Sequence, residues 1–174
     1  MEHELIDWYD EKGKHKGVID KAIAHKKGLW HKSVHVWIIN SNDEVLLQKR
    51  CAQKSFYPNF WDCSFAGHVG AGEASIISAI REGEEELGIK VQTQDLEFLF
   101  TNKEELIWED TISKEFVDVY IMRKNIEIEN LKYQIEEVES AKYFKLDELL
   151  TDKRKSDILP HDEEYKLLKE ILLK

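Results

Sequence analysis

Apolar runs and polar turns alternate along the first half of the chain. Residues 34–39 are apolar apart from His35 and read as a buried strand, and residues 44–50, with the apolar centre Val45-Leu46-Leu47, read as the returning strand. The four residues between them, 40–43, are asparagine, serine and aspartate, which readily form turns. The pattern therefore predicts a β-hairpin.

Further strands are expected later in the chain. Residues 61–69 follow a proline-containing loop, residues 96–101 carry large apolar side chains, and residues 114–123 alternate as a strand does. Residues 1–30 predict a short leading β-element followed by a polar segment.

Apolar positions spaced by three and four residues predict a helix over residues 74–87, ended by Gly88. Its apolar stripe consists of Ile76, Ile80, Gly83 and Leu87. Glycine inside a helix costs about 1 kcal/mol relative to alanine. Gly83 therefore predicts that the backbone of a neighbouring strand packs closely there.

The C-terminal part is expected to be helical. A helical segment begins at residues 147–150, Pro160 interrupts it, and residues 161–173 predict a terminal amphipathic helix. Strands flanked by helices predict the α/β class, with a mixed sheet between helices. The length of 174 residues suits a single domain over 1–174.

Charge and composition limit the class of partner. The formal net charge is −10, which argues against binding duplex nucleic acid, whose recognition needs a basic surface. Only two cysteines are present, and the N-terminus lacks the pattern of a secretory signal. No apolar run approaches the length that crosses a membrane. These features favour a cytoplasmic protein that does not contact membranes.

Three glutamates in the predicted helix form the main candidate for chemistry. Glu82, Glu85 and Glu86 are spaced i, i+3 and i+4, which places them on one side of a helix. Their mutual repulsion is not relieved by lysine, because none occurs between Ala74 and Ile89. Hard oxygen ligands suit Mg²⁺ or Mn²⁺, and such ions commonly serve phosphoryl chemistry.

The segment from Gly67 to Ile89 resembles the Nudix box, Gly-x5-Glu-x7-Arg-Glu-U-x-Glu-Glu-x-Gly-U, where U is a bulky aliphatic residue. Gly83 is the one departure, since it occupies an aliphatic position. The matching residues are Gly67, Glu73, Arg81, Glu82, Glu85, Glu86, Gly88 and Ile89. The resemblance covers roughly residues 30–150 and implies the Nudix α/β/α sandwich, with an N-terminal extension and a C-terminal helix.

The resemblance also implies an activity and a set of roles. Nudix enzymes hydrolyse a diphosphate joined to a further group X, with divalent cations. By position, the metal ligands and catalytic residues are Glu82, Glu85, Glu86 and Glu115, with a backbone carbonyl of Ala66 or Gly67 as an additional ligand. Glu115 is also the candidate general base; the alternative is an edge-strand charge facing solvent. Arg81 would orient a box glutamate, and Glu73 would brace the loop.

Two basic residues before the box are candidates for substrate binding. Lys49 and Arg50 could bind a phosphate at the end of their strand, or be surface residues at the end of a hairpin. The expected partner is a small-molecule diphosphate. The sequence leaves open whether the protein forms a homodimer. The sequence does not define X.

A wider set of residues narrows the resemblance: His25, His31, the hairpin with Leu46-Leu47-Gln48-Lys49-Arg50, Pro58, Trp61-Asp62-Cys63-Ser64 and Gly67-His68. Together these residues look like isopentenyl-diphosphate isomerase and its hydrolase-like relatives. In the isomerase a catalytic cysteine precedes the Gly-His pair, but Ala66 stands there in this chain and cannot transfer a proton. The implied function is therefore a hydrolase, with isomerisation or noncatalytic ligand sensing as alternatives. His25, His31, His35 and His68 would form a metal site or be structural, and Cys63 is expected in the core.

Overall fold

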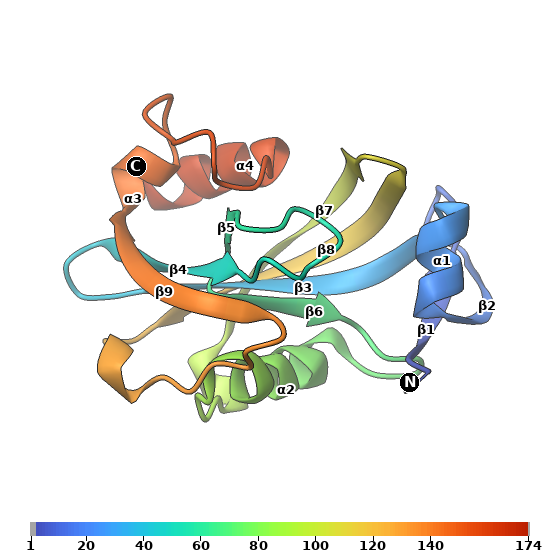
Figure 1. Ribbon diagram of the computed structural model, residues 1–174, viewed down its shortest axis with the longest axis horizontal. Coiled ribbons are helices and arrows are strands. Elements are labelled where there is room, and N and C mark those ends of the chain that lie inside the picture. Colours follow the sequence, from blue (N-terminus) through green and yellow to red (C-terminus); the bar gives the residue numbers. More distant parts are fainter. Residues whose placement is uncertain (1–2, 174) are drawn as a thin grey trace.

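The computed structural model describes residues 3–173, in which a mixed sheet lies between helices (Figure 1). Its central strand is β3 (Trp30–Ile39), which pairs in parallel with β8 (Thr111–Arg123) along its full length. On its other side β3 pairs with β4 (Glu44–Arg50) and β6 (Phe65–His68), both antiparallel. The remaining strands are β1 (Leu5–Tyr9), β2 (His15–Asp20), β5 (Trp61–Asp62), β7 (Glu97–Trp108) and β9 (Val138–Lys145).

Helices cover the two faces of the sheet and one of its ends. Helix α2 (Ser75–Leu87) lies below the sheet in Figure 1, whereas α3 (Leu146–Leu149) and α4 (Asp162–Leu172) lie above it. Helix α1 (Lys21–Lys27) packs at the end that carries β1 and β2. This three-layer arrangement confirms the predicted α/β class. No helix within residues 3–173 is long and apolar enough to cross a membrane.

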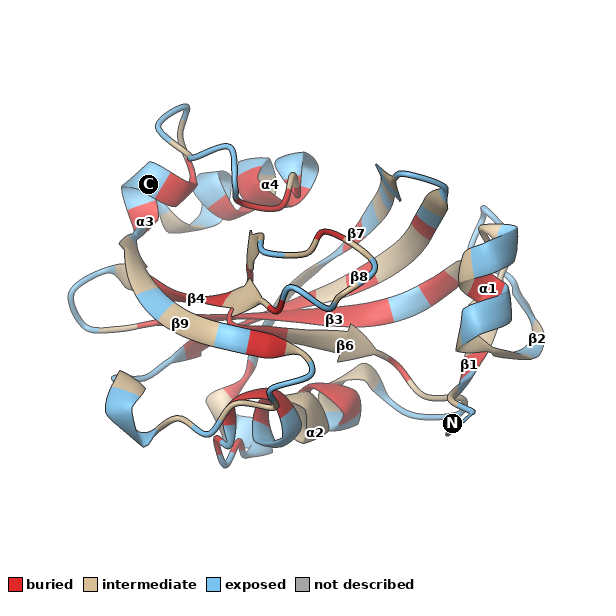
Figure 2. Cartoon of the chain, viewed as in Figure 1, coloured by how far each residue is buried: buried red, intermediate tan, exposed pale blue. Residues whose placement is uncertain are grey.

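Alternation along β3 sends its side chains to two separate cores. Val34, Val36 and Ile38 pack with α2, while Trp37 and Ile39 pack with α3 and α4. Figure 2 shows β3 buried along most of its length. A strand buried on both faces explains why residues 34–39 are apolar at every position except His35.

The hairpin predicted over residues 34–50 is confirmed, since Ile38 is opposite Leu46 and Ile39 is opposite Val45. The box helix and its end at Gly88, which has a φ of 67°, are also confirmed. The terminal helix lies at Asp162–Leu172.

The strand expected over residues 61–69 is divided into β5 and β6. Between them the Ser64 hydroxyl accepts a hydrogen bond from the Ile38 amide and donates one to the Leu46 carbonyl. This side chain bonds the backbones of β3 and β4 at the point where the strand is interrupted.

Three elements differ from the sequence-based expectation. Strand β7 continues well beyond residue 101 and forms a long hairpin with β8, turning at Glu109, whose φ is 51°. Helix α1 was not predicted because seven residues give too little periodicity; Asp20 caps its start and Gly28 ends it with a φ of 64°. Strand β9 was also missed.

The expectation for Gly83 was wrong in detail. A Cβ there would lie 2.8 Å from Val91 Cγ2 and 3.0 Å from Phe65 Cζ, so side chains rather than a strand backbone occupy the space. The absence of a side chain lets α2 pack against β6 and the segment that follows the helix.

Candidate active site

A cavity of about 740 Å³ opens between α2, the loop after β4, the strands β3, β6 and β8, and the start of α4. Glu82, Glu85 and Glu86 all line it from α2. The i, i+3, i+4 spacing therefore places the three carboxylates at one cavity wall, as the helical pattern predicted.

Glu82 of α2 lies against Gly67 of β6. A Cβ at Gly67 would overlap the Glu82 carboxylate, so this position has room only for glycine. Burial, followed by the neighbouring charge of Glu85, raises the pKa of Glu82 to about 7. The unfavourable carboxylate charge is what a bound cation would relieve.

Glu86 is the deepest of the three glutamates. Gln48 of β4 donates a hydrogen bond of 2.5 Å to its carboxylate, and burial followed by the charge of Glu82 raises the pKa of Glu86 well above its ordinary value. Glu85 is the most open, with half of its side chain exposed.

Arg81 and Glu73 join the glycine-rich loop to α2. Arg81 Nη1 donates to Glu73 at 2.7 Å, and the Glu73 carboxylate also accepts from Ser78 and from the Gly70 amide. Arg81 also lies 3.7 Å from Glu82 and 3.8 Å from Glu85. The two residues thus have the contacts that the supporting roles require.

Glu115 is not an edge-strand charge. It lies on β8, which is flanked by β3 and β7, and only 15% of its side chain is exposed. Its carboxylate accepts hydrogen bonds from the hydroxyls of Ser33 and Ser113. Burial opposes ionisation, but the nearby His31 and His68 outweigh it and hold the pKa of Glu115 well below its ordinary value.

Three histidines surround Glu115, and together the four side chains have the spacing of a metal site. Nε2 of His31 is buried without a hydrogen-bond partner among residues 3–173 and lies 3.5 Å from Glu115. Nε2 of His68 lies 3.6 Å from the same carboxylate oxygen and 3.2 Å from Nε2 of His25. Burial, followed by the neighbouring His68 and His31, lowers the pKa of His25 to about 4, so the ring is neutral at pH 7 and one of its two nitrogens carries no proton.

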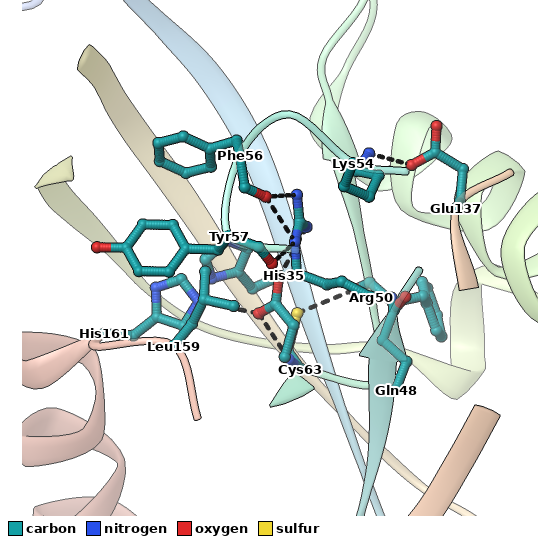
Figure 3. A network of polar contacts seen from close by, with 12 residues as sticks. His35, Gln48, Arg50, Lys54, Phe56, Tyr57, Cys63, Glu137, Leu159 and His161 are labelled. Atoms are coloured by element: carbon teal, nitrogen blue, oxygen red, sulfur yellow. Dashed lines mark hydrogen bonds and ion pairs between the residues drawn. The ribbon is translucent and has the colours of Figure 1, made fainter. Parts of the chain in front are cut away.

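The two basic candidates are placed differently. Arg50 lines the cavity, but its guanidinium donates to the carbonyls of Phe56 and Tyr57 and lies 3.4 Å from Asp62 (Figure 3). The structure does not bring Lys49 to the cavity, and its ammonium lies 3.8 Å from Glu139 on β9. Lys54, by contrast, lines the cavity and pairs with Glu137.

Ala66, the residue before the Gly67-His68 pair, and the nearby Cys63 lie in different surroundings. Ala66 lines the cavity, whereas Cys63 is fully buried in the core on the α4 side, as expected of a core residue. No thiol from these positions reaches the cavity.

Several cavity residues were not assigned a role from the sequence. Gln48 and His35 are on predicted strands, and alternation along β3 places His35 on the same face as His31, a signal that was available. Glu104 and His161 come from elements distant in sequence. The cavity residues missed by sequence reasoning include Gln48, Asp62, Glu104, His161 and the two serines that bond to Glu115, and His35 was considered only as part of a histidine metal site.

Comparisons with known proteins agree with this architecture. The NUDIX domain family matches residues 29–165. Nudix hydrolase 3 of Arabidopsis thaliana is 36% identical over 170 residues, or 93% of this chain, although the chain spans only 22% of that relative's length. An uncharacterized Nudix hydrolase of Clostridium acetobutylicum is 36% identical over 152 residues, covering 86% of this chain and 73% of the relative.

The isomerase resemblance is also found. An isopentenyl-diphosphate Delta-isomerase of Pectobacterium atrosepticum is 36% identical over 81 residues, which cover 47% of this chain and 45% of the isomerase.

Solved structures support the fold. A Deinococcus radiodurans protein superposes with a TM-score of 0.73 at 20% identity, covering 94% of this chain and 98% of that one. The NUDIX domain of Shewanella oneidensis NrtR, crystallised with ADP ribose, has a TM-score of 0.61 at 17% identity, covering 82% and 88%. From the matched family model and these relatives, the chain belongs to the Nudix family.

Proposed function

We propose that the protein is a divalent-metal-dependent hydrolase of organic diphosphates, including diphosphates linked to a nucleoside. The observation that carries this proposal is the convergence of Glu82, Glu85 and Glu86 on one cavity, with Glu86 buried and Glu82 half-buried. Within residues 3–173, Arg81 is the basic side chain paired with these carboxylates. Membership of the Nudix family supports the same activity.

The donor atoms offered by α2 are of the chemical kind that a hard divalent ion prefers. Carboxylates of Glu82, Glu85 and Glu86, together with the Gly67 carbonyl, offer the all-oxygen set that Mg²⁺ or Mn²⁺ prefers. The ion, when bound, would neutralise charge on the phosphates and lower the pKa of a water molecule.

The second donor set is chemically different. Three imidazoles and Glu115 suit a first-row transition ion better than Mg²⁺. Nε2 of His31, which has no hydrogen-bond partner within residues 3–173, and the neutral ring of His25 fit such a ligand role. The low pKa of Glu115 favours its ionised form, which suits a ligand more than a general base.

Side chains of the cavity would then accept the proton and position the loop and helix. Glu85 is the most exposed box carboxylate and can accept a proton from the attacking water, whereas Glu82 fills the space beside Gly67 and Glu86 accepts a hydrogen bond from Gln48. Arg81 and Glu73 keep the loop and helix in register. Arg50 orients the loop that forms the cavity wall, because its donors are directed at Phe56 and Tyr57.

The direct test is hydrolysis of a panel of nucleoside diphosphates, nucleotide sugars and isoprenoid diphosphates with Mg²⁺ or Mn²⁺, with products identified by mass spectrometry. Glu85→Gln should lower kcat by about 10²-fold or more, the scale of removing a group that acts in proton transfer. Glu84→Gln is the matched control, because Glu84 is exposed and does not line the cavity. Equal activity of the two variants would refute the role of the box, and no turnover by the wild type would indicate a ligand-sensing module.

Isomerisation is the second candidate, and the histidine cluster around Glu115 favours it. Ala66 opposes it, since no ionisable side chain stands at that position. Incubation with isopentenyl diphosphate should give no dimethylallyl diphosphate; its formation would establish the isomerase instead.

A further inference from the structure

A second polar cluster lines the same cavity on the α4 side and is not used by the proposed chemistry. His35 of β3 lies there, and its Nδ1 is 2.8 Å from the carboxylate of Glu164 on α4. Glu164 is completely buried and also accepts a hydrogen bond of 2.8 Å from Trp37. These contacts fix the orientation of the His35 ring.

The neighbouring His161 is fully engaged. Its Nδ1 lies 2.7 Å from Glu104 and its Nε2 lies 2.9 Å from Asp62, so both ring nitrogens have carboxylate partners. Its ring packs against His35 with a centroid distance of 4.6 Å, and both rings are drawn in Figure 3. His161 therefore serves to position Glu104 and Asp62.

Two atoms of the cluster are left open toward the cavity. Nε2 of His35 and Oε2 of Glu104 make no hydrogen bond to any residue within 3–173, although both side chains are at least nine-tenths buried and line the cavity. Donor or acceptor atoms of His35, Glu104 and Glu115 lie within 4.8 Å of one another. Polar atoms at a buried wall lose their bonds to water when a ligand covers them, so they favour a ligand that bonds to them.

The chemistry of these atoms selects among possible ligands. A phosphate oxygen would be repelled by the carboxylates of Glu104 and Glu115. A hydrocarbon group would leave the imidazole and the carboxylate unpaired. A hydroxyl both donates and accepts, so it can pair with His35 and Glu104 at the same time.

The geometry points to a subsite in which His35 and Glu104 bind a hydroxyl group on the part of the substrate attached to the diphosphate. This inference rests on the proposed diphosphate hydrolysis and narrows it to substrates whose X is hydroxylated, such as a sugar or ribose, over prenyl diphosphates. Glu164 and His161 are positioning residues, since they hold His35 and Glu104 in place.

A matched pair of substrates tests the subsite. Ribose 5-diphosphate and pentyl diphosphate both carry a five-carbon group, and they differ mainly in hydroxyls. With Mg²⁺ and the full chain, kcat/KM should be at least about 10²-fold higher for ribose 5-diphosphate, because a site built to bond a hydroxyl rejects the analogue that lacks it.

Two variants identify the residues responsible. His35→Gln and Glu104→Gln should each lower the ratio of the two kcat/KM values by about 10-fold or more, whereas Glu105→Gln, next to Glu104 but exposed, should leave both values unchanged. An equal loss for both substrates would assign these residues a structural role and overturn the subsite. A wild type that hydrolyses pentyl diphosphate as well as ribose 5-diphosphate would overturn it too.

Binding measurements distinguish a failure of the hydroxyl subsite from a failure of the proposed hydrolysis. If the wild type hydrolyses neither compound, the wider substrate panel decides the proposed function, and calorimetry with these two compounds and Mg²⁺ decides the subsite alone. Tighter binding of ribose 5-diphosphate that is lost in His35→Gln would support it, and equal binding of both would refute it. Loss of one Mn²⁺ equivalent in Glu104→Gln without substrate would show that the three side chains hold a metal ion instead.

Discussion

Gly67 and Glu82 show how one missing side chain sets up the proposed metal site. The carboxylate of Glu82 occupies the space that any larger residue at position 67 would need. Gly67 has no positive φ, so its backbone would accept alanine and the restriction comes only from this contact. The first glycine of the box is therefore explained by the position of a glutamate fifteen residues later.

Gly67→Ala should weaken Mg²⁺ binding by about 10–100-fold, the usual effect of displacing a group that orients a ligand. Titration calorimetry measures the change. In a Glu82→Gln background the same substitution should have little further effect on Mg²⁺ binding, because the carboxylate that the added methyl group would displace has already been replaced by an amide. Additive losses in the double variant would contradict this explanation.

Helix α2 combines a buried stripe with a functional side, and Gly83 lies where the two meet. The missing Cβ lets Phe65 and Val91 pack against the helix, at the cost of lower helix propensity. The Nudix pattern has an aliphatic residue at the position of Gly83. The close approach of Phe65 and Val91 explains why glycine occurs there in this chain.

Gly83→Ala tests this packing. The gain of about 1 kcal/mol in helix propensity is opposed by overpacking of about 1–3 kcal/mol, so we expect a net destabilisation of about 1 kcal/mol in urea unfolding. Adding Val91→Ala should remove the closest contact and make the Gly83→Ala step stabilising. A Gly83→Ala protein more stable than the wild type would show that the space is not restrictive.

At the scale of elements, periodicity located the box helix, the first hairpin and the terminal helix because each repeats its pattern over enough residues. It missed α1, which is only seven residues long, and β9, whose side chains are mostly half-buried or exposed. The interruption at Ser64 depends on hydrogen bonds to β3 and β4, which no local pattern reveals.

At the scale of the whole molecule, the cavity is assembled from segments that are far apart in the sequence. The box glutamates could be found from their spacing, because a helix brings them together by itself. The pairing of His35 with Glu164 joins residues 129 positions apart, and that of His161 with Glu104 joins residues 57 positions apart. Only the tertiary fold brings these side chains to one wall.

The ion pair between Glu164 of α4 and His35 of β3 should make the free energy of unfolding depend on pH. Burial alone lowers the pKa of His35, but Glu164 outweighs it and raises that pKa to about 9; His161 opposes and Glu104 assists this effect. Because the folded pKa exceeds the ordinary 6.5, the stabilisation is complete below pH 6.5 and is lost as the pH rises through 9. The pKa of Glu164 is lowered, so its contribution is present above 4.5 and lost in acid.

Glu164→Gln should therefore destabilise the fold by about 3 kcal/mol between pH 4.5 and 6.5, as expected when one partner of a buried ion pair is removed. The difference from the wild type should shrink as the pH approaches 9. Urea unfolding across this range measures it, with the exposed Glu163→Gln as control. A difference that grows with pH would contradict the assigned charge of His35.

Metal uptake tests the central claim most directly, because the proposed chemistry depends on the glutamates of α2. Mn²⁺ is titrated calorimetrically into the protein in the presence of methylenediphosphonate, a diphosphate analogue that is not hydrolysed. We predict saturable uptake by the wild type and by Glu84→Gln, and uptake reduced by at least one ion in Glu82→Gln and Glu86→Gln. No uptake by the wild type, or equal uptake by all four proteins, would contradict the account.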